Sequence, residues 1–165
     1  MEKPLWAPWR MEFIRAPKPD GCIFCDFPAA PEAADRANLV VHRTAYAFTC
    51  LNRYPYNSGH LMVIPRAHVS ELAALAPEAF ADLQDELRRA VEVVKATYRP
   101  EGLNVGMNLG RAAGAGIADH LHWHVVPRWI GDNNFMPVLA DQRVVVEALD
   151  EAWERLRAGF EAAPA

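Results

Sequence analysis

The sequence predicts a single α+β domain, with an antiparallel sheet of about five strands covered by helices. Two observations carry this prediction: five short apolar runs separated by polar turns, and one long amphipathic segment. The length of 165 residues suits one domain, which buries roughly 70% of the surface that the unfolded chain exposes. Hydrophobic residues make up 52% and charged residues 23%, the balance of a globular protein.

Charge and terminal composition exclude several classes of protein. The formal net charge of −4 argues against broad electrostatic binding to nucleic acid. No apolar run approaches the roughly 20 residues that a membrane helix needs, so no membrane partner is expected. The first residues lack a basic region followed by an apolar core, which argues against a secretory signal. We therefore expect a cytoplasmic protein.

Strands are expected where β-branched and apolar residues cluster between turns. They fall at residues 39–42, 45–51, 60–64, 103–109 and about 120–126. The first two are close enough to form a hairpin. Before them, residues 1–21 are rich in proline and predict an irregular arm that contains Trp6 and Trp9. Residues 31–38 predict an exposed loop.

The clearest helix runs from Pro77 to about Tyr98, because proline suits the first helical position. Apolar residues recur within it at steps of three and four and predict one buried stripe that packs on a sheet. That stripe consists of Phe80, Leu83, Leu87, Val91, Val94 and Tyr98. A second helix is expected over Gln142–Phe160.

Three histidines in five residues mark the most informative segment, residues 120–124 (His-Leu-His-Trp-His). A spacing of two places all three imidazoles on one side of a strand, whereas a helix would point the middle one away. Such a row serves metal ligation, or nucleophilic and acid–base chemistry near neutral pH. A solvent-exposed polar face is the alternative.

A loop of small residues leads into this segment: residues 108–116 are Asn-Leu-Gly-Arg-Ala-Ala-Gly-Ala-Gly. Such loops let backbone N–H groups approach an anion closely, and Arg111 adds a positive charge. A flexible connection could have the same composition. Beside a row of imidazoles the loop favours phosphate, because a neutral histidine can attack phosphorus while backbone donors hold the oxygens.

The three cysteines indicate two environments. Cys22 and Cys25 have the spacing of half a metal site, with a redox pair or two buried thiols as alternatives. A thioredoxin-like pair would open a helix in a βαβ unit, and the turn-forming residues 18–21 argue against that setting. Cys50 lies in an apolar run and is expected to be a buried thiol in a strand.

Together these segments resemble the histidine triad (HIT) superfamily of nucleotide hydrolases and transferases. Residues 120–126 meet its pattern of three histidines alternating with apolar residues, and residues 52–55 and 59–68 are similar to its hairpin. The resemblance covers roughly residues 20–136. The segments 6–10 and 128–135 are most similar to the bacterial branch that acts on diadenosine polyphosphates.

The resemblance implies a single HIT domain over residues 1–165. Its parts are an N-terminal arm at 1–21, the HIT core at 22–136 and a C-terminal helical segment at 137–165. It also implies a homodimer, because relatives form a continuous sheet across two subunits. No organic cofactor is expected.

The resemblance further assigns roles to single residues. His122 matches the nucleophile that forms a covalent nucleotidyl-histidine, and His124 matches the histidine that positions or protonates the leaving group. His60 matches a supporting histidine behind the nucleophile, or else a strand-end histidine that only satisfies a buried backbone group. Asn52 falls where the family contacts ribose, and Asn108 where it contacts phosphate.

Two positions before the triad depart from the family pattern. The family often has glutamine followed by serine or threonine, where this chain has Gly116 and Ile117. The usual side-chain donors to the α-phosphate and leaving group are therefore missing. We expect the loop to substitute for them through Gly110, Arg111, Gly114 and Gly116.

Related members with Cys-x-x-Cys near the start use it with two histidines to hold a structural zinc ion. The matching residues here are Cys22, Cys25, His68 and His120. Two thiolates and two imidazoles suit tetrahedral Zn²⁺ with no open position, so the expected role is stabilising.

The resemblance predicts an enzyme that cleaves a dinucleoside polyphosphate such as diadenosine tetraphosphate through an adenylyl-histidine. Inorganic phosphate or water accepts the adenylyl group, so a phosphorylase and a hydrolase both remain open. The lack of side-chain donors at Gly116 and Ile117 favours phosphate. The alternatives are a nucleoside phosphoramidate hydrolase, a nucleotidylyltransferase with a sugar phosphate acceptor, and a nucleotide-binding module without catalysis.

Overall fold

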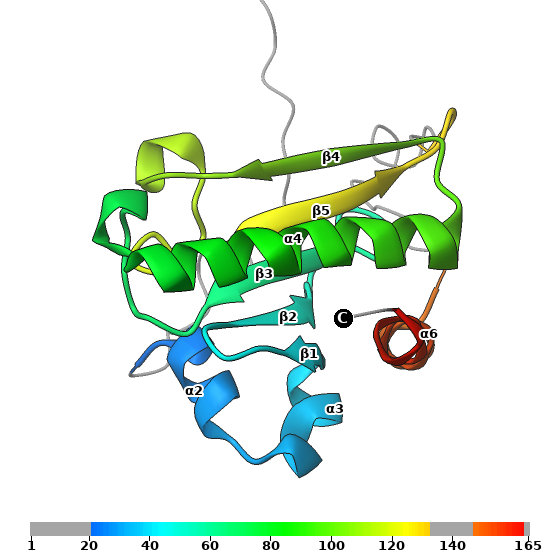
Figure 1. The fold of residues 1–165 in the computed structure, drawn as a ribbon. Coiled ribbons are helices and arrows are strands. Elements are labelled where there is room, and N and C mark those ends of the chain that lie inside the picture. Colours follow the sequence, from blue (N-terminus) through cyan, green and yellow to red (C-terminus); the bar gives the residue numbers. More distant parts are fainter. Residues whose placement is uncertain (1–20, 133–146, 164–165) are drawn as a thin grey trace, which may run out of the picture.

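A computed structural model describes residues 21–132 and 147–163, and its core is a five-stranded antiparallel sheet (Figure 1). The strands follow the order β1-β2-β3-β5-β4 across the sheet. Their bounds are β1 (Val40–Arg43), β2 (Ala47–Leu51), β3 (Leu61–Pro65), β4 (Gly102–Met107) and β5 (Trp123–Arg128). The predicted fold class and strand number are confirmed.

Helices cover the two faces of this sheet separately, because alternate residues of a strand point to opposite sides. Ala47 and Leu51 of β2 pack in the same core as α4 (Pro77–Tyr98), which crosses one face (Figure 1). Phe48 and Cys50 pack on the other face with Phe24 of α2 (Ile23–Ala29). Cys50 is fully buried in a strand, as predicted.

The register of the sheet aligns one residue from each of four strands. Val40 pairs with Cys50, Cys50 with Met62, and Met62 with His124. Neighbouring strands lie about 4.8 Å apart, so these three steps span roughly 14 Å. We call these four residues the cross-strand row. It lies on the face covered by α2 and connects the beginning of β1 with the histidines.

Helix α4 packs most of the predicted stripe against the core, but burial departs from the prediction at two positions. Leu83 is fully buried, but Phe80 is 41% exposed, and Glu86 belongs to the buried residues. The Glu86 carboxylate accepts hydrogen bonds from the Thr49 hydroxyl of β2 and from Nδ1 of His42 of β1, the latter at 2.9 Å. Two donors on the sheet therefore satisfy a charged group that the sequence pattern places in solvent.

The loop predicted at residues 31–38 is largely helical, although most of these residues are exposed as predicted. These residues form a 3₁₀ turn, η1 (Glu32–Ala34), followed by the short helix α3 (Asp35–Asn38). The reason is a long-range contact: Asp35 is buried because it finds a cationic partner on β1.

That partner is Arg43, which joins three elements. Its Nε–H donates to the Asp35 carboxylate at 3.0 Å. Its two terminal nitrogens donate to the carbonyls of Pro28 at 3.0 Å and Phe27 at 2.9 Å, near the end of α2. The side chain is only 12% exposed. One buried guanidinium thus holds α2, α3 and β1 together.

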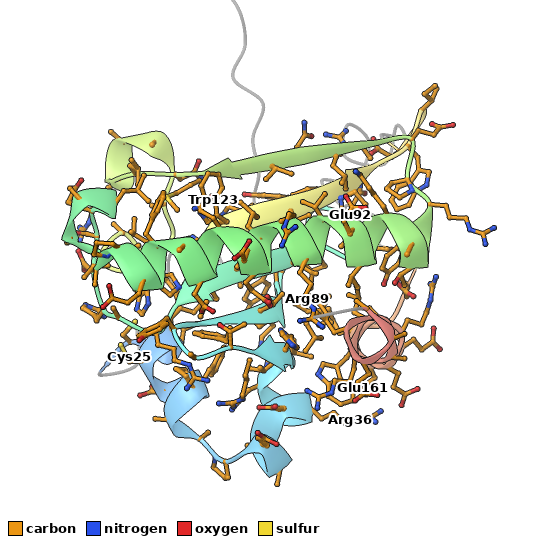
Figure 2. All side chains as sticks on the ribbon, in the orientation of Figure 1. Cys25, Arg36, Arg89, Glu92, Trp123 and Glu161 are labelled. Carbon is orange, nitrogen blue, oxygen red and sulfur yellow. The ribbon has the colours of Figure 1, made fainter. Side chains whose placement is uncertain are left out.

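The C-terminal helix and the last strands begin or end at other residues than predicted. The helix α6 runs over Leu149–Ala162 rather than from Gln142, and residues 142–146 lie outside the described part of the chain. Strand β4 ends at Met107, two residues early. Strand β5 begins at Trp123 (Figure 2), so two of the three histidines precede it.

The remaining short turns are η2 (Leu72–Ala74) and η3 (Arg111–Ala113). The predicted arm with Trp6 and Trp9 lies outside the described residues. None of the helices within residues 21–132 and 147–163 is long and apolar enough to cross a membrane.

Replacing Arg43 with Leu should lower the free energy of unfolding by about 3–5 kcal/mol, because the buried Asp35 carboxylate loses its hydrogen-bonded partner and retains only Arg157, at 3.9 Å. Urea denaturation followed by circular dichroism measures this change. The matched control is Arg88→Leu, which removes an ion pair whose members are 78% and 73% exposed. The control should change stability by less than about 1 kcal/mol. Equal losses in both variants would contradict this account of Arg43.

Candidate active site

His122 lies at the centre of the candidate site, immediately before β5. Its Nδ1–H donates to the backbone carbonyl of His120 at 2.9 Å, so the lone pair of the neutral ring is on Nε2. Burial lowers the pKa of His122 from the ordinary value of a histidine, against the opposing effect of that hydrogen bond. A neutral imidazole with a defined lone pair can act as a nucleophile.

A chain of hydrogen bonds fixes the tautomer of His124. The backbone N–H of Tyr56 donates to Nδ1 of His60 at 3.1 Å, so the proton of the neutral His60 ring is on Nε2. That Nε2–H donates to Nδ1 of His124 at 2.9 Å. His124 therefore carries its own proton on Nε2, the form that can protonate a leaving oxygen. The contact of His60 is thus with His124, whereas the sequence analysis expects it behind His122.

Gly59 sets the turn that delivers His60 to this position. Its φ of +75° lies in the left-handed region that glycine adopts freely. A Cβ at this residue would lie 2.5 Å from the ring of Tyr98 on α4. The turn therefore packs directly on the long helix, and only glycine fits there.

A cleft with about 990 Å³ of empty space opens at the histidines. Six of its lining residues were predicted as catalytic or binding residues: Asn52, Asn108, Gly114, Gly116, His122 and His124. Gly110 and Arg111, expected to bind phosphate, are not in the lining, and both are exposed. Most residues predicted for the site therefore line one cleft, whereas Arg111, the charged residue of the loop, is outside its lining.

Sequence reasoning missed one wall of the cleft. That wall contains Ile23, Phe24, Phe27, Asn38, Leu39, Tyr54 and Tyr56. The Phe24 ring lies 5.2 Å from that of His122. The spacing of Ile23 and Phe27 by four residues is a weak helical signal that could have indicated this wall. No local signal marks Asn38, which lies in the segment predicted as a loop.

Cys22 and Cys25 open helix α2, which the sequence analysis did not expect. Cys22 is the residue before the helix and Cys25 lies in its first turn. The helix packs on an antiparallel sheet, and no described strand pairs parallel to another. The βαβ setting of a thioredoxin-like pair is therefore absent from the described residues.

The four residues predicted as metal ligands lie together, with all their ligand atoms within 4.8 Å of one another. The Cys25 sulfur is 3.2 Å from Nδ1 of His68 and 3.7 Å from Nδ1 of His120. The Cys22 sulfur is 3.4 Å from Nδ1 of His120. In a tetrahedral zinc site the metal–sulfur bonds are about 2.3 Å and the metal–nitrogen bonds about 2.0 Å. A sulfur ligand and a nitrogen ligand are then about 3.5 Å apart, close to the distances found here. The cluster fits a metal ion.

His120 is oriented for ligation. Its Nε2–H donates to the carbonyl of Pro65 at 2.8 Å, which leaves the lone pair on Nδ1, the atom that faces the cysteines. Burial lowers the pKa of His120 and favours the neutral ring. Cys25 lies where α2 approaches the sheet (Figure 2). A metal ion held here would tie α2 to the residues before β5.

The sheet, the histidine row and the cleft define a class of protein that a family comparison identifies. The HIT domain family model matches residues 34–129, more than half of the chain. The chain belongs to the HIT domain family, as the sequence analysis predicted.

Individual relatives cover most of the chain. An AP-4-A phosphorylase of Mycobacterium tuberculosis is 42% identical over 151 residues, 88% of this chain and 77% of the relative. An adenosine 5′-monophosphoramidase of Schizosaccharomyces pombe is 30% identical, over 65% of this chain and 74% of the relative. A zinc-bound histidine triad family protein from Mycobacterium smegmatis superimposes with a TM-score of 0.64 at 25% identity, over 86% of this chain and 94% of that one.

Protein purified without added metal or a metal-binding tag should contain about one equivalent of metal. Cys25→Ser and His68→Ala should reduce that content to well below half an equivalent and lower the unfolding temperature by several degrees. The matched control is Cys50→Ala, which removes a buried thiol outside the cluster and should retain the metal. Elemental analysis and thermal unfolding give the two measurements. Little metal in the wild type, with stability unchanged by chelator, would rule out the site.

Proposed function

We propose that the protein cleaves diadenosine tetraphosphate by two displacements at His122, and that inorganic phosphate is the preferred acceptor. The observation that carries this proposal is the complementary hydrogen bonding of two neighbouring rings, which implies opposite roles for their Nε2 atoms. His122 has its lone pair on Nε2, and His124, whose ring centroid is 5.0 Å away, has its proton on Nε2. One ring is thus a nucleophile and the other an acid.

In the first step, Nε2 of His122 attacks the α-phosphorus of the bound dinucleotide. A nitrogen–phosphorus bond forms as the bond from phosphorus to the bridging oxygen breaks. ATP leaves, and Nε2–H of His124 supplies the proton that its terminal oxygen requires. The adenylyl group remains on His122. Phe24 and Ile117, both in the cleft lining, keep this part of the site apolar.

In the second step, an oxygen of inorganic phosphate attacks the same phosphorus, the bond to His122 breaks, and ADP is released. Water would have to lose a proton during its attack, whereas phosphate is already anionic and needs mainly positioning. Gly116 and Ile117 leave that approach without side-chain donors. The relative named AP-4-A phosphorylase, at 42% identity over 88% of the chain, supports phosphate as acceptor.

The other parts of the proposal concern binding and assembly. Asn52 would contact the ribose and Asn108 the phosphates, with backbone N–H groups of Gly114 and Gly116 as further donors.

Zinc is the metal that two thiolates and two imidazoles favour, and its role at Cys22, Cys25, His68 and His120 would be structural. The zinc-bound M. smegmatis structure supports this identity.

A homodimer would extend the sheet through β4. This strand is at the edge of the described sheet, and Val105 on it is 43% exposed. Uncovered edges with apolar side chains are prone to pairing, and a second copy of the chain would satisfy this one. We propose that the protein acts as such a dimer.

Labelled α-phosphate should remain on the wild-type protein after a rapid quench that avoids acid, and His122→Ala should trap no label. Turnover should fall by several orders of magnitude, because the nucleophile is removed. AMP affinity should stay within about tenfold, since other residues bind the nucleotide. In His124→Ala the label should still form, only more slowly. Turnover of His122→Ala within tenfold of wild type would exclude the covalent route and favour a binding module or another mechanism.

A phosphate titration should separate the two acceptors. With diadenosine tetraphosphate as substrate, ADP and ATP should dominate at millimolar phosphate, and the rate should fall steeply when phosphate is removed. Chromatography of the products gives the ratio of ADP to AMP. AMP as the main product at every phosphate concentration would identify a hydrolase instead.

A further inference from the structure

We propose that Asn38 determines base specificity by pairing its side-chain amide with the edge of adenine. This inference rests on the proposed function, because it takes the reacting phosphate to lie at His122. Asn38 lines the same cleft as the two catalytic histidines. Most residues in the wall of the cleft that contains Asn38 are apolar, and Asn38 is the one residue of that wall with a carboxamide side chain.

The register of the sheet places Asn38 at the correct side of the site. The cross-strand row runs from Val40 at the beginning of β1 to His124 on β5, roughly 14 Å away. Asn52 follows β2, between these limits, and is the proposed ribose contact. A nucleotide with phosphate at His122 and ribose at Asn52 therefore directs its base toward β1. Asn38 lies two residues before that strand.

Contacts on both sides hold Asn38 in place. Asp35, the first residue of α3, is bound by Arg43, and the carbonyl of Ala37 accepts a hydrogen bond from Arg53 at 3.0 Å. Leu39 then takes the left-handed conformation, with φ of +60°. This is unfavourable for leucine, yet it buries Leu39 in the core under α4 and reverses the chain directly after Asn38.

The chemistry of the surrounding side chains fits a purine. Ile23 and Phe27 of α2 line the same cleft as Asn38 and offer apolar surface to a flat ring. Within the described residues the amide of Asn38 makes no hydrogen bond, so its donor and its acceptor are both available to a ligand. Adenine presents a donor, the 6-amino group, beside a ring-nitrogen acceptor, and a carboxamide pairs with both.

A double-mutant cycle tests the pairing. Calorimetry measures binding of AMP and of purine riboside 5′-monophosphate, which lacks the 6-amino group. The wild type should bind AMP about fivefold to tenfold more tightly than the analogue, the effect of one hydrogen bond. Asn38→Leu should bind both ligands equally and AMP more weakly than the wild type does. Unchanged discrimination in Asn38→Leu would overturn the proposal.

Asn38→Asp provides a second variant of almost identical shape. A carboxylate only accepts, so it should repel the ring nitrogen of adenine and pair with the N1–H and 2-amino group of guanine. We expect the ratio of GMP to AMP affinity to rise at least tenfold. A ratio equal to that of the wild type would contradict the assignment.

The same two substitutions at Asn104, an exposed residue of β4 outside the cleft lining, are the matched controls and should leave base preference unchanged. The labelling of His122 separates this inference from the proposed function. Trapped label with base preference insensitive to residue 38 would overturn only the role of Asn38. No AMP binding by the wild type would overturn both.

Discussion

The candidate site depends on the position of His120, which is held by three different groups. Its Nε2–H binds the carbonyl of Pro65 at the end of β3, and its Nδ1 faces the two cysteines at the beginning of α2. Its backbone carbonyl accepts the Nδ1–H of His122. The same residue therefore links the metal cluster, the sheet and the tautomer of the proposed nucleophile. A shift of His120 would disturb all three.

Helix α2 is anchored at both ends by groups of different chemistry. At its beginning, Cys22 and Cys25 meet His68 and His120. At its end, the guanidinium of Arg43 binds the last carbonyls and the buried Asp35. Seven residues form too short a helix to be stable alone in water. These anchors therefore determine where one wall of the cleft lies relative to the histidines.

Local patterns were sufficient to predict the strands, the long helix and the histidine row, because spacing determines which side chains share a face. They indicated only Cys22 and Cys25 of the metal cluster, and His68 and His120 were added through the resemblance to the HIT superfamily. Local patterns failed where a residue depends on a partner far along the chain. The sequence pattern places Asp35 and Glu86 in solvent. In the structure Asp35 is buried against Arg43, and Glu86 is buried where it accepts hydrogen bonds from Thr49 and His42. The four-residue helix α3, and with it Asn38, could not be inferred because its stability comes from such contacts.

Different elements of the chain supply the reacting histidines and part of the cleft lining. The histidines lie on or just before an interior strand, whereas Ile23, Phe24, Phe27 and Asn38 of the cleft lining belong to α2 and α3, which precede the sheet in the chain. Substitutions in those short helices alter the shape of the ligand space without touching the register of β3, β4 and β5. Ligand preference can therefore change through substitutions in α2 and α3 while the reacting groups stay fixed.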